Sequence, residues 1–446
     1  MDSSFRVIVV GGGPIGLTAA HALSHAGLDF VLLERRESVV VDAGASLVLM
    51  PSGLRVMAQL GLLDTLGNVS SALWHNTRQD HDGNDLWNYD YAVDFNSYLG
   101  ARPRVVSRHE ISKTLYESLP DRAKVSILSN KKVSCLSTDE DGVSVTCADG
   151  TAYRGSIVIG ADGAHSIVRQ HVRALNTGLS HATDDERSFV STYRCLWMRF
   201  PLSASSRLEP GTASETHGPG TSTQLFCGPD SAVVAIYERL DSPTEERVRY
   251  TEADERSLIE RRGDLSLLPG HALTMRRAYD LRIQSGMVDL EEGVAEHWSG
   301  GSRFVLVGDA AHKFTPNTGS GCNQGMVDVF ALGNELYKAV ASRDGDRTPA
   351  KESIEQAFQA YQDLRKPAAV AHCRAGGRVA ATSTWSSAVL TFVDRWVFSL
   401  SQVRSYFIWK ASVKESQMPM LSYVPGEERF TGSVPWVNPV PSSVGV

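Results

Sequence analysis

Short apolar runs and turn residues alternate near the start of the chain in an order that predicts a βαβ unit. Residues 6–10 (RVIVV) form a β-branched run typical of a strand buried on both faces of a parallel sheet. Residues 15–26 place apolar side chains at helical spacing, and Gly27 follows as a helix stop. Residues 30–33 (FVLL) form a second buried strand, which ends before Glu34.

The remainder of the chain changes its pattern twice. Residues 155–160 and 303–308 are apolar runs that end at glycine, and we expect both in the first sheet. Residues 188–283 instead contain alternating strands, such as 190–200 and 232–240, divided by turns rich in Pro, Gly, Ser and Thr, as around 210–222. This pattern is typical of an antiparallel sheet. From residue 350 the pattern is helical, and a proline-rich tail follows.

Length, charge and cysteine content exclude several classes of protein. At 446 residues the chain is long enough for two or three domains. With 44 Lys and Arg against 51 Asp and Glu, the formal charge is −7, and no long basic run offers a nucleic-acid surface. The six cysteines are scattered without zinc-ligand spacing, so we expect free thiols and no metal site. The N-terminus lacks a basic, cleavable leader, so we expect a cytoplasmic protein.

A glycine turn follows the first strand directly. Gly11, Gly13 and Gly16 fit GxGxxG, in which one glycine permits a tight turn, one lets a pyrophosphate approach the backbone, and one lets the helix pack on the strand. Glu34, with Arg35 beside it, follows the second strand, where a carboxylate can bind ribose hydroxyls. The unit predicts a Rossmann-like dinucleotide-binding domain and leaves open whether the dinucleotide is a flavin or a nicotinamide.

Two further segments separate these alternatives. Residues 160–169 (GADGAHSIVR) resemble the GADGxxSxVR signature of the group A FAD-dependent monooxygenases, the class that includes aromatic hydroxylases. Residues 308–321, which contain GDAAH followed by Pro316, Gly319 and Gly321, resemble the GDAAHxxxPxxGQG segment of that family. The three motifs occur in the family's order. The resemblance therefore implies FAD as the cofactor.

The resemblance also implies roles for individual residues. Asp309 would accept a hydrogen bond from the ribityl chain, and backbone amides from Gly319 and Gly321 to Cys322 would hold a flavin carbonyl. Arg108 matches an arginine that reaches FAD from the start of a helix, where a guanidinium would pair with a phosphate. The alternative for Arg108 is an exposed charge on the helix surface.

Other residues have competing interpretations. Asp162 either contacts flavin and nicotinamide, as the family implies, or orders the turn between strand and helix. For His312 we favour a histidine satisfied within a loop over a catalytic one, and for His217 a solvated turn residue over one that lines a cavity. The Gln of the family's GQG is Ser320 here, and Cys322 follows it closely. We expect FAD binding to survive these departures and the redox environment to differ.

The resemblance implies an α/β fold with a Rossmann-like FAD-binding domain, an interleaved antiparallel-sheet substrate domain and a C-terminal helical region. We expect the FAD-binding domain to be discontinuous, over residues 1–72, 103–180 and 285–349. The substrate domain would take residues 73–102 and 181–284, and the helical region residues 350–446.

Within the family, the sequence is most similar to fungal monooxygenases that epoxidise or hydroxylate meroterpenoid, indole-diterpene, alkaloid or polyketide intermediates. The similarity depends on residues 193–195 (YRC), on Tyr361 with Arg365 and Pro367, and on residues 424–425 (VP) and 434–436 (VPW). It implies that NADPH reduces FAD transiently and that a flavin hydroperoxide formed with dioxygen oxygenates an electron-rich, hydrophobic small molecule of secondary metabolism. The alternatives are an aromatic ring hydroxylase of the salicylate-hydroxylase type, an NAD(P)-dependent dehydrogenase and a non-enzymatic prenyl-protein escort.

Two residues of the expected antiparallel sheet are candidates for catalysis. In strand 190–200, alternation places Tyr193 and Cys195 on one face and Arg194 and Leu196 on the other. By resemblance, Arg194 would orient a substrate carbonyl, and the alternative is a salt-bridged sheet arginine. Tyr237 is a second, weaker candidate for a hydrogen-bond donor, for which packing is the alternative.

The last long apolar stretch, residues 388–409, is interrupted by Asp394, Arg395 and Arg404, so we expect no membrane-spanning helix. Apolar residues at positions 392, 396, 400, 403 and 407 recur at helical spacing. We expect this stripe to pack on the body of the protein. The alternative is a lid, or a peripheral contact with a membrane that admits apolar substrates.

Overall fold

A six-stranded sheet forms the first part of the fold in the computed structural model, which describes residues 5–42, 44–178, 189–341 and 349–442. The sheet order is β17-β18-β11-β1-β2-β7, and all neighbours except β17 and β18 are parallel. Its strands are β1 (Arg6–Val10), β2 (Asp29–Leu33), β7 (Ile127–Leu128), β11 (Ile157–Gly160), β17 (Ser299–Gly300) and β18 (Phe304–Leu306). The predicted βαβ unit is confirmed, with α1 (Pro14–His25) between β1 and β2.

Parallel pairing brings the carboxyl ends of four strands to one edge of this sheet. Val10, the last residue of β1, lies opposite Leu33 and Gly160, and Gly160 lies opposite Leu306. The loops after β1, β2, β11 and β18 therefore leave the sheet side by side. These are the loops that carry the motifs of the sequence analysis.

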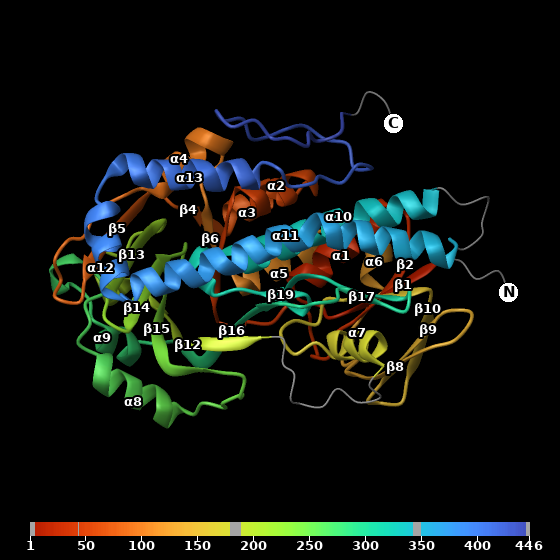
Figure 1. Ribbon diagram of the computed structural model, residues 1–446, viewed down its shortest axis with the longest axis horizontal. Helices are drawn as coiled ribbons and strands as arrows, with labels where there is room; N and C mark the ends of the chain where they lie inside the picture. Colours follow the sequence, from red (N-terminus) through yellow and green to blue (C-terminus); the bar gives the residue numbers. More distant parts are fainter. Residues whose placement is uncertain (1–4, 43, 179–188, 342–348, 443–446) are drawn as a thin grey trace.

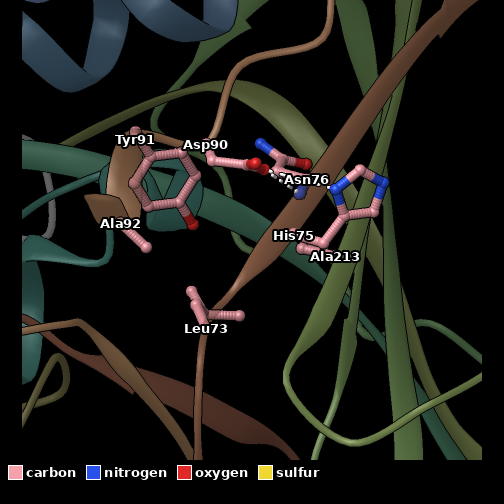
Figure 2. Close-up of a pocket in the computed structure, with 7 residues that line it drawn as sticks. All are labelled: Leu73, His75, Asn76, Asp90, Tyr91, Ala92 and Ala213. Atoms are coloured by element: carbon pink, nitrogen blue, oxygen red, sulfur yellow. Dashed lines mark hydrogen bonds and ion pairs between the residues drawn. The ribbon is translucent and has the colours of Figure 1, made fainter. Parts of the chain in front are cut away.

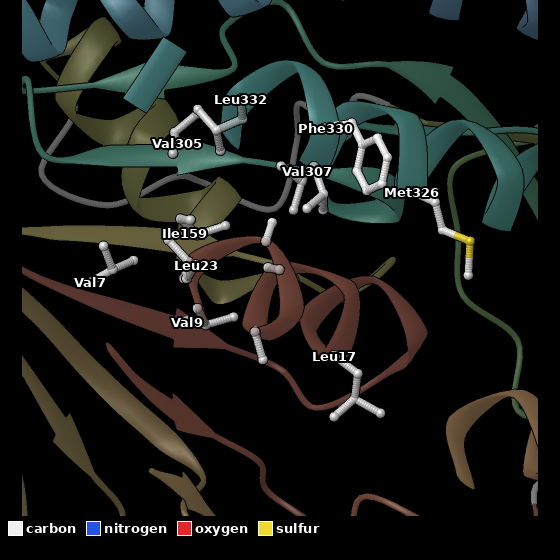
Figure 3. Close-up of a cluster of buried hydrophobic side chains, with 14 of the residues drawn as sticks. Val7, Val9, Leu17, Leu23, Ile159, Val305, Val307, Met326, Phe330 and Leu332 are labelled. Carbon is white, nitrogen blue, oxygen red and sulfur yellow. The ribbon is translucent and has the colours of Figure 1, made fainter. Parts of the chain in front are cut away.

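The core of this part lies where the strands meet α1 and α10 (Ser320–Ala341). Figure 3 shows Leu17 and Leu23 of α1 and Met326 and Phe330 of α10 beside the strands, and all four are buried. Burying such apolar side chains contributes about 1.5–3 kcal/mol each to folding. The same packing fixes the start of α10 relative to the glycine turn.

Two small antiparallel sheets and several helices complete this part (Figure 1). One sheet contains β8 (Val133–Thr138), β9 (Val143–Cys147) and β10 (Ala152–Gly155), and the other β3 (Ser46–Leu49), β4 (Ser70–Ala72) and β6 (Arg104–Ser107). The helices are α2 (Pro51–Gln59), α3 (Leu63–Asn68), α5 (Arg108–Glu117), α6 (Asp121–Lys124) and α7 (Ile167–Thr177). The 3-10 turns η3 (Gly308–Ala310) and η4 (Pro316–Thr318) follow β18, whereas η1 (Leu202–Ala204) and η2 (Pro269–His271) belong to the second part.

The second part is a seven-stranded sheet in the order β19-β16-β12-β15-β14-β13-β5. Its strands are β5 (His75–Asp80), β12 (Val190–Pro201), β13 (Thr212–Gly218), β14 (Thr221–Cys227), β15 (Ser231–Thr244), β16 (Gln284–Val294) and β19 (His312–Lys313). The predicted antiparallel pairing holds except between β5 and β13, which are parallel. Helices α8 (Glu252–Arg262) and α9 (Met275–Asp280) pack on one face of this sheet through a separate apolar cluster. We call this face of the sheet the outer face and the opposite face the inner face.

The sheet differs from the sequence expectation in two places. Residues 212–218 form β13, although the segment 210–222 was expected to be turns, because they pair with β14 on one side and β5 on the other and become buried inside the sheet. Strand β16 pairs with β12 and so extends the sheet beyond residue 284, the boundary expected for the substrate domain. The expected boundary at 180–181 lies outside the described residues, and the division into domains stays a prediction.

The predicted C-terminal helical region is confirmed, and its longest helix connects the two large sheets. Helix α11 (Lys351–Ser383) runs along the molecule from the first sheet to the second (Figure 1). The Tyr361 hydroxyl donates to the carbonyl of Leu306 in β18 at 2.9 Å, and the Ser383 hydroxyl donates to Ser222 in β14 at 3.1 Å. Helix α12 (Ala388–Phe392), the π-helical turn η5 (Val393–Val397) and α13 (Ser401–Glu415) follow, and α13 packs on α4 (Tyr91–Leu99). No helix in the described ranges is long and apolar enough to cross a membrane.

Candidate cofactor and substrate site

The three glycines of the turn after β1 have different surroundings. Gly11 has φ +105°, and a Cβ there would lie 2.4 Å from the carbonyl oxygen of Ala161. A Cβ at Gly16 would lie 1.9 Å from the carbonyl oxygen of Gly11. A Cβ at Gly13 would meet no atom of the described residues within 4 Å. Gly11 and Gly16 are thus required for the turn itself, whereas Gly13 leaves its open side free for a phosphate at the start of α1.

Glu34 lies against this turn. Its Oε2 accepts a hydrogen bond from the backbone N–H of Gly12 at 2.7 Å, and its Oε1 accepts one from Arg36 at 2.9 Å. The side chain is buried, and each carboxylate oxygen keeps a second lone pair for a further donor such as a ribose hydroxyl. Arg35, its neighbour, is exposed.

Asp162 orders the loop after β11. Its carboxylate accepts hydrogen bonds from the Ser166 hydroxyl and, at 2.8 Å, from the backbone N–H of Ile167 in the first turn of α7. Burial raises the pKa of Asp162, and these hydrogen bonds oppose that effect. The contacts match the turn-ordering interpretation of the sequence, and a contact of Asp162 with a cofactor stays a prediction.

The loop after β18 and the start of α10 bring the third motif together. Gly319 has φ +64° and ends η4 directly before α10. Gly321 and Cys322 lie in the first turn of α10, where backbone N–H groups have no acceptor within the helix. A Cβ at Gly321 would lie 3.8 Å from Oδ1 of Asp309, so the carboxylate adjoins this turn. The amide donors fit a flavin carbonyl, and the Asp309 carboxylate fits a ribityl hydroxyl as an acceptor.

Arg108 begins α5, as the sequence predicts, and lies close enough to this turn to influence Cys322. Its side chain is exposed, which matches the alternative of a charge on the helix surface, and a contact with FAD stays a prediction. Its backbone N–H donates to Ala45, just before β3, at 3.0 Å. Burial raises the pKa of the Cys322 thiol to about 12; Arg108 lowers it and Asp309 raises it by smaller amounts. The thiol is therefore protonated at neutral pH, and all six cysteines are free.

Asn323, which the sequence analysis did not select, holds this turn in place. Its Oδ1 accepts from the Met50 N–H at 3.0 Å, and its Nδ2 donates to the carbonyls of Val48 at 2.8 Å and Gly319 at 2.7 Å. The amide thus joins β3, α2 and the start of α10. No local signal could identify it, since Val48 lies 275 residues away.

His312 is a buried structural residue of β19 rather than a loop histidine. Its Nε2 is hydrogen-bonded to Oδ2 of Asp328 in α10, and Arg365 of α11 donates to Oδ1 of Asp328 at 2.8 Å. Burial would raise the pKa of Asp328, but His312 and Arg365 outweigh it and lower that pKa. The favoured non-catalytic interpretation of His312 agrees with this arrangement.

The inner face of the seven-stranded sheet presents Tyr237 toward the flavin motif. Tyr237 is buried in a cluster with Tyr193 and Cys195, and its hydroxyl donates to Oε1 of Gln224 at 3.1 Å. Gln224 in turn donates from Nε2 to the carbonyl of Asn317 in η4 at 3.1 Å. One side chain therefore separates the Tyr237 hydroxyl from the loop that leads into Gly319.

Arg194 lies on the opposite, outer face. Its guanidinium pairs with Glu238 of β15, with Nε to Oε2 at 2.8 Å, and the same carboxylate contacts Arg261 and Arg262 of α8. Of the two interpretations of Arg194, the salt-bridged sheet arginine matches these contacts. The structure does not bring Arg194 together with Tyr237, and a catalytic role for it stays a prediction.

His217 is not the solvated turn residue that the sequence predicted. It lies in β13, is buried, and has Nδ1 2.8 Å from Oδ2 of Asp394 in η5 and Nε2 3.3 Å from Oε2 of Glu215. Arg78 of β5 donates to the same Glu215 oxygen. Burial lowers the pKa of His217, but Asp394 and Glu215 outweigh it and raise that pKa to about 9. His217 is therefore cationic at neutral pH.

A small recess adjoins this network where α4 meets the sheet (Figure 2). It is lined by Leu73, His75, Asn76, Asp90, Tyr91, Ala92 and Ala213. Oδ1 of Asp90 accepts from the backbone N–H of Asn76 at 2.8 Å, which ties β5 to the residue before α4. The recess has no space for a water molecule, so we assign it to packing rather than to a ligand.

The glycine turn and the loops at the edge of the first sheet define a dinucleotide-binding protein. The second sheet lies beside the loop that leads into Gly319. A family model described as "FAD binding domain" matches residues 4–187 and 272–362, and the chain belongs to this family of FAD-dependent proteins. The residues present fit FAD: an open Gly13, an acceptor at Glu34 and free amides at the start of α10.

Two relatives are FAD-dependent monooxygenases from fungi. The srdH protein of Neurospora crassa is 31% identical over 453 residues, which cover 98% of this chain and 99% of the relative. The paxM protein of Penicillium paxilli is 32% identical over 376 residues, which cover 81% of this chain and 76% of the relative. The chain is accordingly a flavoprotein of the FAD-dependent monooxygenases, as the motifs predicted, and not a nicotinamide-dependent dehydrogenase.

Solved structures share the fold. HpxO of Klebsiella pneumoniae, complexed with FAD and uric acid, has a TM-score of 0.72 at 21% identity and covers 93% of this chain and 98% of its own. The p-nitrophenol 4-monooxygenase PnpA of Pseudomonas putida has a TM-score of 0.73 at 21% identity with the same coverage. The predicted α/β architecture is confirmed.

Proposed function

We propose that this chain is an NADPH-dependent monooxygenase that inserts one atom of dioxygen into a hydrophobic, electron-rich alkene or aromatic intermediate of secondary metabolism, by epoxidation or hydroxylation. Its membership of the FAD-dependent monooxygenases and its fungal relatives support this proposal. The observation that carries it is the chain of contacts from Tyr237 through Gln224 to Asn317, which places the inner face of the sheet next to the flavin motif.

We assign the cofactor contacts to the residues predicted from the sequence. Glu34 would hold the ribose and Asp309 the ribityl chain, and the turn that Gly11 and Gly16 make possible would present Gly13 to the pyrophosphate. Arg108 would approach from the start of α5, and the amides of Gly319, Gly321 and Cys322 would hold the ring carbonyl. Bound FAD supplies two-electron redox chemistry with NADPH and activation of dioxygen.

Tyr237 is the polar group that we assign to the substrate side. Burial raises the pKa of its phenol well above 10, so it stays protonated and can donate a hydrogen bond. Gln224, the present acceptor of the Tyr237 hydroxyl, is also buried. Tyr193 and Cys195 pack beside Tyr237, and these buried side chains leave little room for water on this face. A donor in a dry environment orients a polar group of the substrate more strongly than one in water.

The experiment measures NADPH oxidation and oxygen consumption by the FAD-loaded protein with candidate alkene and aromatic compounds, and detects products by mass spectrometry under labelled dioxygen. We expect a substrate to stimulate NADPH oxidation and the product to contain one labelled oxygen atom. NADPH oxidation without oxygenated product for any electron-rich compound, in protein with full flavin content, would contradict the proposal.

The same assay separates the two catalytic candidates. We expect Tyr237→Phe to retain FAD and to reduce product formation about tenfold or more, as the loss of one well-placed hydrogen bond does. Arg194→Ala is compared with Glu238→Gln, because both break the ion pair on the outer face. A loss of product in Arg194→Ala that Glu238→Gln does not share would support a direct role for Arg194, and equal losses would assign it to the fold.

A further inference from the structure

The C-terminal helices expose large apolar side chains on one end of the molecule. The surface formed by α12, η5 and α13, here called the aromatic surface, contains Val389, Phe392, Trp396, Leu400, Tyr406, Phe407 and Trp409, and each of these residues is exposed. Trp396 is 64% exposed, Phe392 59% and Phe407 51%. The expectation that this stripe packs on the body of the protein is therefore wrong. Exposed apolar side chains gathered on adjoining elements indicate an interaction surface.

Asp394 explains why Phe392 and Trp396 point outward. Asp394 is 1% exposed, and its Oδ2 accepts hydrogen bonds from His217 and, at 2.8 Å, from Nε1 of Trp385. Residues two positions away on either side of a buried helical residue lie on the opposite face of the helix. The inward carboxylate thus fixes Phe392 and Trp396 toward solvent.

The ring contacts show that the surface continues onto α13. The rings of Phe398 and Phe407 lie 5.7 Å apart, those of Tyr406 and Phe407 5.8 Å, and those of Tyr406 and Trp409 6.0 Å. The contact of Phe398 with Phe407 thus joins the end of η5 to α13 across the helix break at residues 398–400. Trp and Tyr among these residues favour an environment that is apolar at one end and wet at the other.

Within the segment that carries the aromatic surface, the exposed charged side chains are basic. Residues 388–415, all of which the structure describes, contain four basic residues (Arg395, Arg404, Lys410, Lys414) and two acidic ones, the buried Asp394 and Glu415, which accepts hydrogen bonds from Ser52. Arg395 pairs with Asp80, whereas Lys410 and Lys414 are exposed. This segment is basic although the whole chain carries a formal charge of −7.

We propose that the aromatic surface is a docking surface for the anionic lipid headgroups and outer acyl region of a membrane. Exposed Trp, Tyr, Phe and Leu beside lysines match the chemistry of interfacial, non-spanning membrane contacts. The exposed side chains of Lys410 and Lys414 beside these residues complement the negative charge of anionic lipid headgroups. The surface is joined to the substrate-side sheet through His217 and Asp394, so docking places that sheet beside the membrane.

The test is co-sedimentation of the FAD-loaded protein with vesicles of phosphatidylcholine alone and of phosphatidylcholine mixed with phosphatidylserine. We expect stronger binding to the mixed vesicles and release by salt. The combined variant Phe392→Ser, Trp396→Ser and Phe407→Ser should lose binding by more than about tenfold. The matched control is Val248→Ser with Ile283→Ser, two apolar side chains exposed elsewhere, which should bind like the unaltered protein.

A second pair of variants avoids any effect of the triple substitution on folding. Lys410→Gln and Lys414→Gln should each weaken binding to the mixed vesicles about fivefold and leave flavin content unchanged. Failure of the unaltered protein to sediment with either vesicle would overturn the proposal. Equal binding of the triple variant and the control would also overturn it. A molecular mass in light scattering that differs between the unaltered protein and the triple variant would assign the surface to a second copy of the chain, and would overturn it too. None of these measurements depends on turnover, so they are independent of the proposed reaction.

Discussion

Gly13 and Gly16 belong to the same turn but have opposite surroundings. A Cβ at Gly16 would lie 1.9 Å from a backbone oxygen, whereas a Cβ at Gly13 would meet no described atom within 4 Å. Gly16→Ala should therefore destabilise the cofactor-free protein by about 1–3 kcal/mol or more, which is the typical cost of overpacking. Gly13→Ala should leave that stability within about 0.5 kcal/mol and weaken FAD binding.

Chemical unfolding of the cofactor-free proteins and FAD titration separate these two effects. Equal stability of both variants would contradict the assignment of Gly16 to the fold. Unchanged FAD affinity in Gly13→Ala would contradict the assignment of Gly13 to the phosphate.

Glu34 combines a structural and a binding role in one carboxylate. It accepts from the backbone N–H of Gly12 at 2.7 Å and leaves lone pairs for a ribose. Glu34→Ala should raise the Kd for FAD at least about tenfold, since a hydrogen bond to a charged group contributes about 1.5–3 kcal/mol. Flavin fluorescence titration measures this change, and Glu37→Ala, an exposed carboxylate three residues away, is the control. An unaltered Kd in Glu34→Ala would remove the ribose assignment.

At the scale of elements, a buried charge network fastens the C-terminal segment to the sheet. His217 of β13 lies between Glu215 and Asp394, Glu215 also pairs with Arg78 of β5, and Arg395 of η5 pairs with Asp80. Three charges of each sign thus surround the contact between η5 and the sheet. Removing one partner of such a buried network is strongly destabilising, because a charge is left unpaired.

This network predicts a pH dependence of the contact. The pKa of His217 rises from 6.5 to about 9 on folding, because Asp394 and Glu215 outweigh its burial. Folding therefore favours the protonated form, so the stabilisation is complete below about pH 6.5 and falls as the pH rises through about 9. Hydrogen exchange of residues 388–397, corrected for intrinsic rates, should show increased opening above that pH.

His217→Gln should remove this pH step, because glutamine does not titrate. The groups that face His217 are Glu215 and Asp394, and Arg78 lies behind Glu215. Burial raises the pKa of Glu215, but Arg78 and His217 outweigh this effect and hold that pKa low. A step of the same size in His217→Gln would assign the titration to another group.

For the whole molecule, α11 couples the cofactor part to the sheet part. Tyr361 is bonded to β18, Arg365 to Asp328 of α10, and Ser383 to β14. A ligand that binds only the folded first part should therefore stabilise both parts together.

FAD should accordingly raise the melting temperature by several degrees. At about a hundredfold excess over its Kd, a ligand stabilises the folded state by about 2.7 kcal/mol. Circular dichroism reports the whole fold, and hydrogen exchange of β14 and β15 reports the second sheet. Stabilisation confined to the first sheet would contradict coupling through α11.

The sequence by itself determined the βαβ unit, the glycine turn, the position of Glu34 and the existence of an antiparallel sheet and a helical end. Local spacing decides these features, since a strand, a turn or a helix is specified by residues that are neighbours along the chain. The motif residues from Asp309 to Cys322 could be selected for the same reason.

Only the tertiary structure decided which partners the polar side chains meet. Arg194 pairs with Glu238 on the outer face, His217 is buried against Asp394, and Asn323 binds Val48, over separations of 44, 177 and 275 residues. The exposure of Phe392 likewise follows from Asp394 turning inward. A periodic pattern gives a residue its face on an element, but what covers that face depends on elements folded there from elsewhere in the chain.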